Sequence, residues 1–171
     1  MKFSIVVPAY EEEEVIEEFV REVEAHQPSL KAELDVDLID WSLVVVDDGS
    51  KDKTPEILSN LKKEFPNLVV LTHETNKGLG MALNTGIDHA SNKLNAETVI
   101  TMDADLTHPP RLIPELIKKM HEDDADVCIA SRYVSGGGME DVPWWRVWIS
   151  VVANFLFRLF FGIKAKDVTA G

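Results

Sequence analysis

The sequence predicts an α/β fold, in which a doubly wound and largely parallel β-sheet is flanked by helices. Three observations support this prediction. Short apolar runs alternate along the chain with segments of helical periodicity. The runs are apolar at consecutive positions, which is typical of strands covered on both faces. Several runs end in carboxylates, and ligands bind such sheets beyond the carboxyl ends of the strands.

The predicted elements follow one another in simple order. Strands are expected at residues 3–7, 41–46, 68–71, 98–102 and 126–131. The acidic run Glu11–Glu14 is expected to open the first helix, because carboxylates in a first turn complement the helix dipole. Further helices are expected at 54–65, after Gly78 and at 111–122, with Thr54 as the N-cap of the second. Residues 26–40 have no clean period and are interpreted as a surface insertion, part helical.

The composition bounds the class of protein. With 171 residues, of which 45% are hydrophobic and 27% charged, the chain is long enough to bury one globular core. A formal net charge of -13 argues against a general nucleic-acid binder, which presents clustered Lys and Arg to phosphates. The single cysteine, Cys128, cannot form an internal disulfide, which favours a reducing, cytoplasmic setting. The N-terminal apolar run is too short for a signal peptide.

Two carboxylates, Asp103 and Asp105, follow the fourth apolar run. In an extended backbone alternate residues point to the same face, so these side chains can converge although they stand roughly 7 Å apart along the chain. Such a pair suits Mg²⁺ or Mn²⁺, which commonly takes one or two carboxylates and leaves its other positions to water and phosphate oxygens. The alternative is an ordinary strand end with an Asx turn, stopped by Pro109 and Pro110.

A second pair of carboxylates, Asp47 and Asp48, ends the second predicted strand. Adjacent charges at a buried strand end cost free energy unless they accept hydrogen bonds or face a cation or ligand donors. The alternative is a tight loop in which Asp48 caps its own backbone and Gly49 supplies a positive φ. Further on, Gly78 and Gly80 open a helix, but Leu83 stands where a dinucleotide fingerprint needs its third glycine.

The segment 142–162 has a different character. It is apolar except for a few polar residues at every fourth position, which form one stripe on a helix: Arg146, Ser150, Asn154 and Arg158. Three tryptophans near its start fit a membrane-interface belt. We interpret the segment as an amphipathic helix at a membrane surface, with its arginines toward the active site. The alternative is a helix buried in the protein's own core or against a partner segment.

Taken together, these motifs resemble glycosyltransferase family 2, and within it the polyprenyl-phosphate sugar transferases of the dolichol-phosphate mannosyltransferase type. The matching segments occur in the family's order: Pro8–Glu12, Val46–Asp52, Asn76–Gly80, Met102–Pro110, Ser131–Tyr133 and Asp167–Gly171. The resemblance implies a GT-A fold, a nucleotide-sugar donor, a divalent metal and a lipid-linked phosphate acceptor. Two positions depart from the pattern. Thr107 stands where the family usually has glutamine, and the chain stops at Gly171, where such proteins usually continue.

The resemblance also implies roles for individual residues. Those expected to bind the donor are Pro8, Tyr10, Glu12, Val46, Asp48, Asp103, Ala104 and Asp105. Asp105 and Asp103, with Thr107 as a further candidate, are expected to hold the Mg²⁺ or Mn²⁺ ion. Arg132, Ser135 and Arg146 are expected at the acceptor phosphate. Catalysis is assigned to Asp105, Arg132 and Arg146.

The function expected is that of an inverting hexosyltransferase, which moves mannose from GDP-mannose to a polyprenyl or dolichyl phosphate. Residues 1–141 would form the catalytic core, and 142–171 the membrane-interface helix and the start of an acceptor-side segment. The enzyme would work at the cytoplasmic face of a membrane, peripherally or anchored through segments beyond residue 171. The alternatives are a UDP-glucose-dependent glucosyltransferase and a non-catalytic nucleotide-binding membrane module. A nucleotidyltransferase is disfavoured, because no glycine-rich basic loop follows the first strand.

Overall fold

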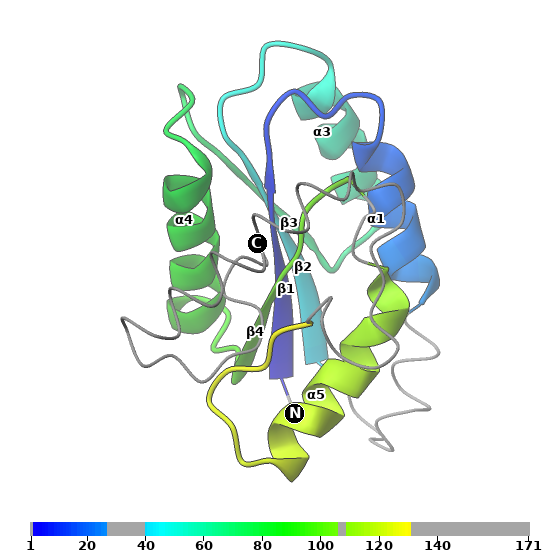
Figure 1. The fold of residues 1–171 in the computed structure, drawn as a ribbon. Coiled ribbons are helices and arrows are strands. Elements are labelled where there is room, and N and C mark those ends of the chain that lie inside the picture. Colours follow the sequence, from blue (N-terminus) through cyan, green and yellow to red (C-terminus); the bar gives the residue numbers. More distant parts are fainter. Residues whose placement is uncertain (1, 27–39, 106–108, 131–171) are drawn as a thin grey trace, which may run out of the picture. The chain divides into compact units, whose positions relative to one another are not determined.

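The computed structural model describes residues 2–26, 40–105 and 109–130. Within them, four parallel strands form one sheet in the order β3-β2-β1-β4 (Figure 1). The strands are β1 (Lys2–Ala9), β2 (Asp40–Asp47), β3 (Leu68–Thr72) and β4 (Thr98–Thr101). β1 pairs with β2 along its whole length, so that Ala9 lies beside Asp47 at the carboxyl edge. The predicted α/β architecture with a parallel sheet is confirmed.

Helices cover both faces of this sheet. α1 (Ile16–Ala25) and α3 (Thr54–Glu64) pack against each other on one face, and α4 (Leu79–Asn92) covers the other (Figure 1). The chain thus winds in one direction from β1 to β3 and then returns to β4, as in doubly wound sheets. It divides into two compact units, residues 1–114 and 115–171, and the sheet with these three helices belongs to the first.

The core follows from the consecutive apolar residues of β1 and β2. On the α4 face, Val6, Val44 and Val46 are fully buried and pack with residues of the helix, among them Ala82 and Ala90. On the opposite face, the alternate residues of β1 and β2 are also fully buried: Ile5, Val7, Leu43 and Val45. Each such side chain contributes about 1.5–3 kcal/mol by leaving water. The sheet is therefore the rigid platform on which the strand ends are placed.

The first helix begins later than the acidic run predicted. Glu11 lies in a bend, residues 13–15 form a turn, and α1 starts only at Ile16. Glu11 has a φ of 57°, outside helical geometry, and the backbone amides of Glu11, Glu12 and Glu13 donate to side chains of the loop after β2. These tertiary hydrogen bonds replace the helical turn that the charge pattern suggested. The prediction that Glu11–Glu14 open the helix was wrong.

The prediction of Thr54 as an N-cap was also wrong. Thr54 is the first residue of α3, and the cap position is taken by Lys53 without a side-chain cap. The Thr54 hydroxyl is fully buried and accepts a hydrogen bond from the Glu12 amide at 2.9 Å. Asp52 instead accepts from the Thr54 amide at 3.0 Å. The hydroxyl therefore joins two loops rather than capping its own helix.

Residues 126–130, predicted as part of a fifth strand, form no strand within the described part of the chain. Val127 is 73% exposed and Ile129 is 43% exposed. An apolar run becomes a strand only where its backbone forms hydrogen bonds with a neighbouring strand. The periodicity of the run does not show whether such a neighbour exists. Before this segment lie the 3₁₀ turn η1 (Pro110–Leu112) and helix α5 (Ile113–Glu122).

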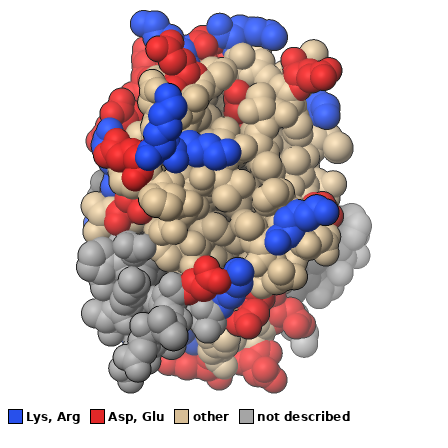
Figure 2. All heavy atoms as spheres, turned by 180° about the vertical axis from the view of Figure 1, so that it is seen from behind, with Lys and Arg blue, Asp and Glu red and all other residues tan. Residues whose placement is uncertain are grey.

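The surface of the described residues carries charges of both signs. On the face drawn in Figure 2, Lys and Arg side chains lie beside Asp and Glu rather than in one continuous patch. An ion-pair group joins two helices, because Arg21 of α1 contacts Glu17 and, at 2.7 Å, Glu64 of α3. No helix in the described ranges has the length and apolar character needed to cross a bilayer. The predicted interface helix at 142–162 and most of the predicted insertion at 26–40 lie outside these ranges.

Candidate functional site

A pocket with a cavity volume of about 360 Å³ opens at the carboxyl edge of the sheet. Its size lies within the usual range for small-molecule sites. The lining residues come from the ends of β1, β2 and β4 and from the start of α4: Pro8, Ala9, Tyr10, Glu12, Asp48, Asn76, Gly78, Leu79, Ala82, Asp103, Ala104 and Asp105. This is the edge at which parallel α/β sheets bind ligands.

The pocket brings together most of the residues that the sequence predicts to bind a donor. Those that line it are Pro8, Tyr10, Glu12, Asp48, Asp103, Ala104 and Asp105. Val46 does not line it, because its side chain is fully buried under α4 with Val6 and Ala82. Thr107, Arg132, Ser135 and Arg146 lie outside the described residues.

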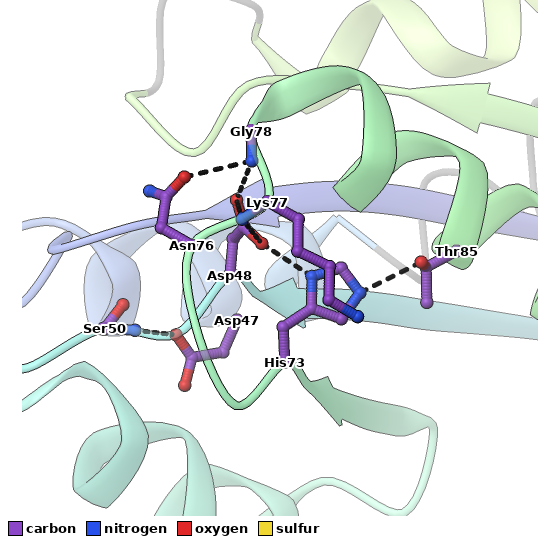
Figure 3. Close-up of polar contacts among 8 residues, drawn as sticks. All are labelled: Asp47, Asp48, Ser50, His73, Asn76, Lys77, Gly78 and Thr85. Carbon is purple, nitrogen blue, oxygen red and sulfur yellow. Dashed lines mark hydrogen bonds and ion pairs between the residues drawn. The ribbon is translucent and has the colours of Figure 1, made fainter.

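Asp48 is buried in the pocket wall and accepts hydrogen bonds on both carboxylate oxygens (Figure 3). His73 Nδ1 lies 2.6 Å from Oδ1, and the Gly78 amide donates to Oδ2 at 2.7 Å. The Lys77 amide donates to both oxygens, at 2.9 and 3.1 Å. Asp48 thus does not cap its own loop, as one reading of the sequence held. It ties the end of β2 to the segment that leads into α4.

These contacts decide the charge of Asp48. Burial alone would raise the pKa of this carboxyl, but the hydrogen bonds from His73, Lys77 and Gly78 outweigh burial and lower it below its ordinary value. The carboxylate is therefore ionised at neutral pH. An ionised carboxylate can only accept hydrogen bonds, so His73 carries a proton on Nδ1, and this N–H donates a hydrogen bond to Asp48.

Asp47 has a separate environment, although it adjoins Asp48. Its Oδ1 accepts from the Ser50 amide at 3.0 Å, and Figure 3 shows its carboxylate directed away from His73. Its Oδ2 is buried and has no hydrogen-bond partner among the described residues. Asp48 lies beyond the end of β2, lines the pocket and has other hydrogen-bond partners, so the two carboxylates do not form one site.

Gly49 allows the two loops beside Asp48 to touch. It has a φ of 78°, as in the tight-loop alternative of the sequence analysis, and a Cβ added there would lie 2.6 Å from the Thr75 carbonyl carbon and 2.7 Å from the Asn76 nitrogen. Both contacts are with backbone, which cannot rotate away. Only glycine fits both the conformation and this approach.

The loop after β1 is fastened to the loop after β2 by what we call the clasp, the hydrogen bonds between residues 11–13 and 50–54. The amides of Glu11, Glu12 and Glu13 donate to Ser50 Oγ, Thr54 Oγ1 and Asp52 Oδ2 at 2.9, 2.9 and 3.1 Å. In return, Glu13 Oε2 accepts from the Lys53 amide at 2.9 Å. The clasp fixes the backbone that presents Tyr10 and Glu12 to the pocket.

Negative charge gathers on the side of the pocket formed by Glu12, Asp103 and Asp105. Burial raises the pKa of Glu12, and the charges of Asp105, Asp52 and Asp103 raise it further. β4 ends at Thr101, one residue earlier than predicted, and Ala104 and Asp105 lie in a turn. The turn, rather than strand alternation, therefore presents this pair. Within the described ranges, no group of three or more His, Cys, Asp or Glu side chains is arranged to hold a metal ion.

Sequence reasoning assigned no role to several residues of the site. Asn76, Gly78, Leu79 and Ala82 line the pocket, and His73 stands behind it. Asn76 and Gly78 belong to the matching segment Asn76–Gly80, so their position before a predicted helix could have indicated that they line the site. His73 offered none, because its partners Asp48 and Thr85 are remote in sequence.

Comparison with known proteins identifies the family. The family model for glycosyl transferase family 2 matches residues 4–171. The chain belongs to glycosyl transferase family 2. It is 36% identical over 168 residues to a dolichol-phosphate mannosyltransferase of Pyrococcus furiosus, covering 98% of this chain and 43% of that protein. It is 33% identical over 168 residues to a polyprenol monophosphomannose synthase of Mycolicibacterium smegmatis, covering 98% of this chain and 58% of that protein.

A solved structure shares the fold of this family 2 chain. A mannosyltransferase from Pyrobaculum calidifontis, in complex with GDP-Man and Mn²⁺, superposes with a TM-score of 0.56 at 26% identity over 69% of this chain and 32% of that one. The core therefore has the GT-A glycosyltransferase fold. The chain spans about half the length of the curated relatives it matches.

Proposed function

We propose that this family 2 chain is the donor-binding part of an inverting glycosyltransferase that moves a hexose from a nucleotide sugar to a polyprenyl phosphate. The observation that supports it most is the convergence of Asp48, Tyr10 and the acidic residues after β4 on one pocket at the carboxyl edge. The ends of β1, β2 and β4, which are remote in sequence, meet there beside the first residues of α4. The pocket would hold the nucleoside at its Tyr10 and Asp48 side and the diphosphate near Asp103 and Asp105.

For the donor we propose GDP-mannose. The names of the relatives support mannose, and the structure from Pyrobaculum calidifontis was solved with GDP-Man. UDP-glucose remains the alternative, because no described contact selects guanine over uracil. For the acceptor we propose polyprenyl or dolichyl phosphate, as the names of the two relatives suggest.

We also propose that transfer needs Mg²⁺ or Mn²⁺. The carboxylates of Asp103 and Asp105 are the oxygen ligands such ions prefer. The pKa of Glu12 is raised first by burial and then by the negative charges of Asp105, Asp52 and Asp103, so negative charge collects on this side of the pocket. Asp105 and Asp103 would hold the ion, with Thr107 as a third candidate. When bound, the ion would neutralise charge on the leaving diphosphate.

The proposed chemistry needs no general base. A phosphate acceptor is already anionic near neutral pH, so it can attack the anomeric carbon directly while the protein aligns the two substrates. We propose that Arg132, Ser135 and Arg146 hold the acceptor phosphate. A single displacement gives inversion at the anomeric carbon, and retention would contradict the proposal.

We further propose that residues 1–141 act as the catalytic core and that 142–171 lie at the cytoplasmic face of a membrane, as an amphipathic helix and the start of the acceptor-side segment. The apolar run with its stripe of polar residues supports this proposal.

The proposal is tested first by donor binding. GDP, UDP, GDP-mannose and UDP-glucose are titrated calorimetrically into the protein, with and without Mn²⁺. Metal-dependent binding of GDP and GDP-mannose is expected. Preferred binding of UDP and UDP-glucose would make UDP-glucose the donor. If none of the four ligands binds, the proposed function is overturned. Binding without product from labelled donor and polyprenyl phosphate would instead support a non-catalytic module.

Asp105→Ala tests the site chemistry. Transfer is expected to fall by about 100-fold, the order of loss seen when one group that stabilises transition-state charge is removed. The matched control is Asp88→Ala, which removes an exposed carboxylate of α4 that contacts Asn92. Full activity of Asp105→Ala would remove this residue from the mechanism.

A further inference from the structure

His73 is a buried polar residue behind the pocket wall, outside every motif of the sequence. Its side chain is only 7% exposed and bridges two elements (Figure 3). Nδ1 lies 2.6 Å from Asp48 Oδ1, and Nε2 lies 3.0 Å from the hydroxyl oxygen of Thr85 in α4. The imidazole thus links the end of β2 to the helix that begins at the pocket.

We propose that His73 is a positioning residue for the nucleotide site. It holds the Asp48 carboxylate in the orientation that fixes Lys77 and Gly78, and thereby the start of α4, in the pocket wall. The inference rests on the proposed function in that the pocket is taken to bind a nucleotide.

The hydrogen bonds of Asp48 explain why one donor matters. A carboxylate offers about four lone-pair positions, and the contacts from His73, Lys77 and Gly78 occupy them within the protein. The His73 contact is the shortest of them, and water cannot readily replace it because Asp48 is 3% exposed. Without His73 the Asp48 carboxylate loses this hydrogen bond and can rotate, and the loop at Lys77 and Gly78 then shifts with it.

Thr85 sets which nitrogen faces Asp48. The two ring nitrogens of a histidine are distinguished by the hydrogen bond that each one makes. Asp48 requires a proton on Nδ1, and the Thr85 hydroxyl engages Nε2 on the other side. Thr85 therefore holds the ring in the plane and orientation that the Asp48 contact needs.

The order carboxylate, imidazole, hydroxyl also occurs in nucleophilic triads, but the placement here differs. In a triad the hydroxyl faces the substrate. Neither Thr85 nor His73 lines the described pocket, whereas Asp48 and Gly78 do. The arrangement supports the carboxylate at the pocket rather than activating a nucleophile.

The test compares nucleotide binding and kinetics of four variants with the wild type. In His73→Ala the Kd for GDP and the KM for the nucleotide sugar are expected to rise about tenfold with a smaller change in kcat, since about 1.4 kcal/mol corresponds to a factor of ten. His73→Asn is expected to recover most of the affinity, because its amide can donate to Asp48. Thr85→Val, which removes only the outer hydrogen bond, is expected to weaken binding less.

Ser42→Ala is the matched control. Ser42 shares a 2.8 Å hydrogen bond with Ser4 across β1 and β2, away from the pocket. Its loss lowers the thermal midpoint without changing the Kd for GDP. If His73→Ala fails to fold, the Kd and KM of Thr85→Val and His73→Asn are compared with those of the wild type instead.

Nuclear magnetic resonance separates this inference from the proposed function. The wild type is expected to show the Nδ1–H form of His73, and His73→Ala is expected to move the amide signals of Lys77 and Gly78. If the wild type binds no nucleotide, the proposed function fails, and unmoved amide signals overturn the positioning role independently. Wild-type affinity in His73→Ala, or no recovery in His73→Asn, would also overturn it.

Discussion

At the scale of single residues, Asp47 and Asp48 show how adjacent identical side chains acquire different roles. Asp48 faces the pocket and accepts from His73 and from backbone amides that begin α4. Asp47 points elsewhere and organises its own turn through the Ser50 amide. The sequence left a ligand site and a tight loop as alternatives; in the structure Asp48 lines the pocket and Asp47 organises the turn.

The lowered pKa of Asp48 predicts acid sensitivity. In the pH range between the native pKa and the unfolded value of about 3.9, the unfolded chain binds more protons, so the free energy of unfolding rises with pH. The contribution of Asp48 is complete above the unfolded value and is lost as pH falls through the native pKa. Urea unfolding of the wild type between pH 5 and pH 2, at half-unit steps, measures this slope.

Asp48→Asn is expected to make that slope shallower and to lower stability at pH 7. The slope does not vanish, because Asp52 also has a lowered pKa: burial opposes the shift, but hydrogen bonds from Thr54 and Glu13 outweigh it. Asp88→Asn controls for the loss of one exposed charge. A slope in Asp48→Asn equal to that of the wild type would contradict the prediction.

The sequence indicated most of the pocket residues but not their support. Asp103, Asp105 and Asp48 stood out because carboxylates after apolar runs are unusual, and their position at strand ends gave them one common edge. His73 did not stand out, since a lone histidine carries no pattern and its contacts span 25 and 12 positions of the chain. Such contacts exist only once the sheet has formed.

At the scale of elements, tertiary contacts decided where helices begin. The acidic run and the Thr-Pro pair are both good local signals for helix starts. In the structure the same segments form the clasp, because the amides of residues 11–13 donate to the side chains of Ser50, Thr54 and Asp52 across two loops. Local propensity therefore gave these two helices correctly and their first residues incorrectly, whereas α4 begins directly after Gly78 as expected.

Helix α4 lies so close to the sheet that one of its positions requires glycine. A Cβ at Gly86 would come within 2.4 Å of Val6 Cγ1 and 3.1 Å of Val46 Cγ2. Gly86→Ala is expected to destabilise the protein by about 1–2 kcal/mol. The overpacking cost of about 1–3 kcal/mol exceeds the gain of up to about 1 kcal/mol from helix propensity.

Gly80→Ala provides the matched comparison in the same helix, because a Cβ there has nothing within 4 Å. This variant is expected to be neutral or slightly more stable in urea unfolding. Equal effects of the two substitutions would show that propensity, rather than contact with the sheet, governs position 86.

At the scale of the whole molecule, the described pocket draws all its lining residues from positions 8–105. The residues proposed for the acceptor, Arg132, Ser135 and Arg146, come later in the chain. Donor binding and acceptor binding should therefore be separable by mutation. The sequence predicted the parallel sheet, because it follows from the order of apolar runs. The division between donor and acceptor residues follows from the family resemblance and stays a prediction. The sequence did not predict which run pairs with which, and residues 126–130 are the resulting error.

Arg146→Ala tests this separation. The Kd for the nucleotide is expected to stay within about twofold of the wild type, while the KM for polyprenyl phosphate rises by about tenfold or more, as expected for loss of a charge-assisted hydrogen bond. Arg111→Ala, at an exposed arginine of the described surface, is the control. A large loss of nucleotide affinity in Arg146→Ala would place this arginine at the donor instead.

The clasp has a consequence for how a phosphate group can be received. In many α/β proteins free amides of the loop between the first strand and the first helix help to form a cradle for anions. Here the amides of Glu11, Glu12 and Glu13 are already engaged by Ser50, Thr54 and Asp52, and the side chains around them are acidic. This turn repels a diphosphate rather than attracting it. A phosphorylated ligand in this pocket must bring its counter-charge from a bound cation or from basic side chains elsewhere in the chain.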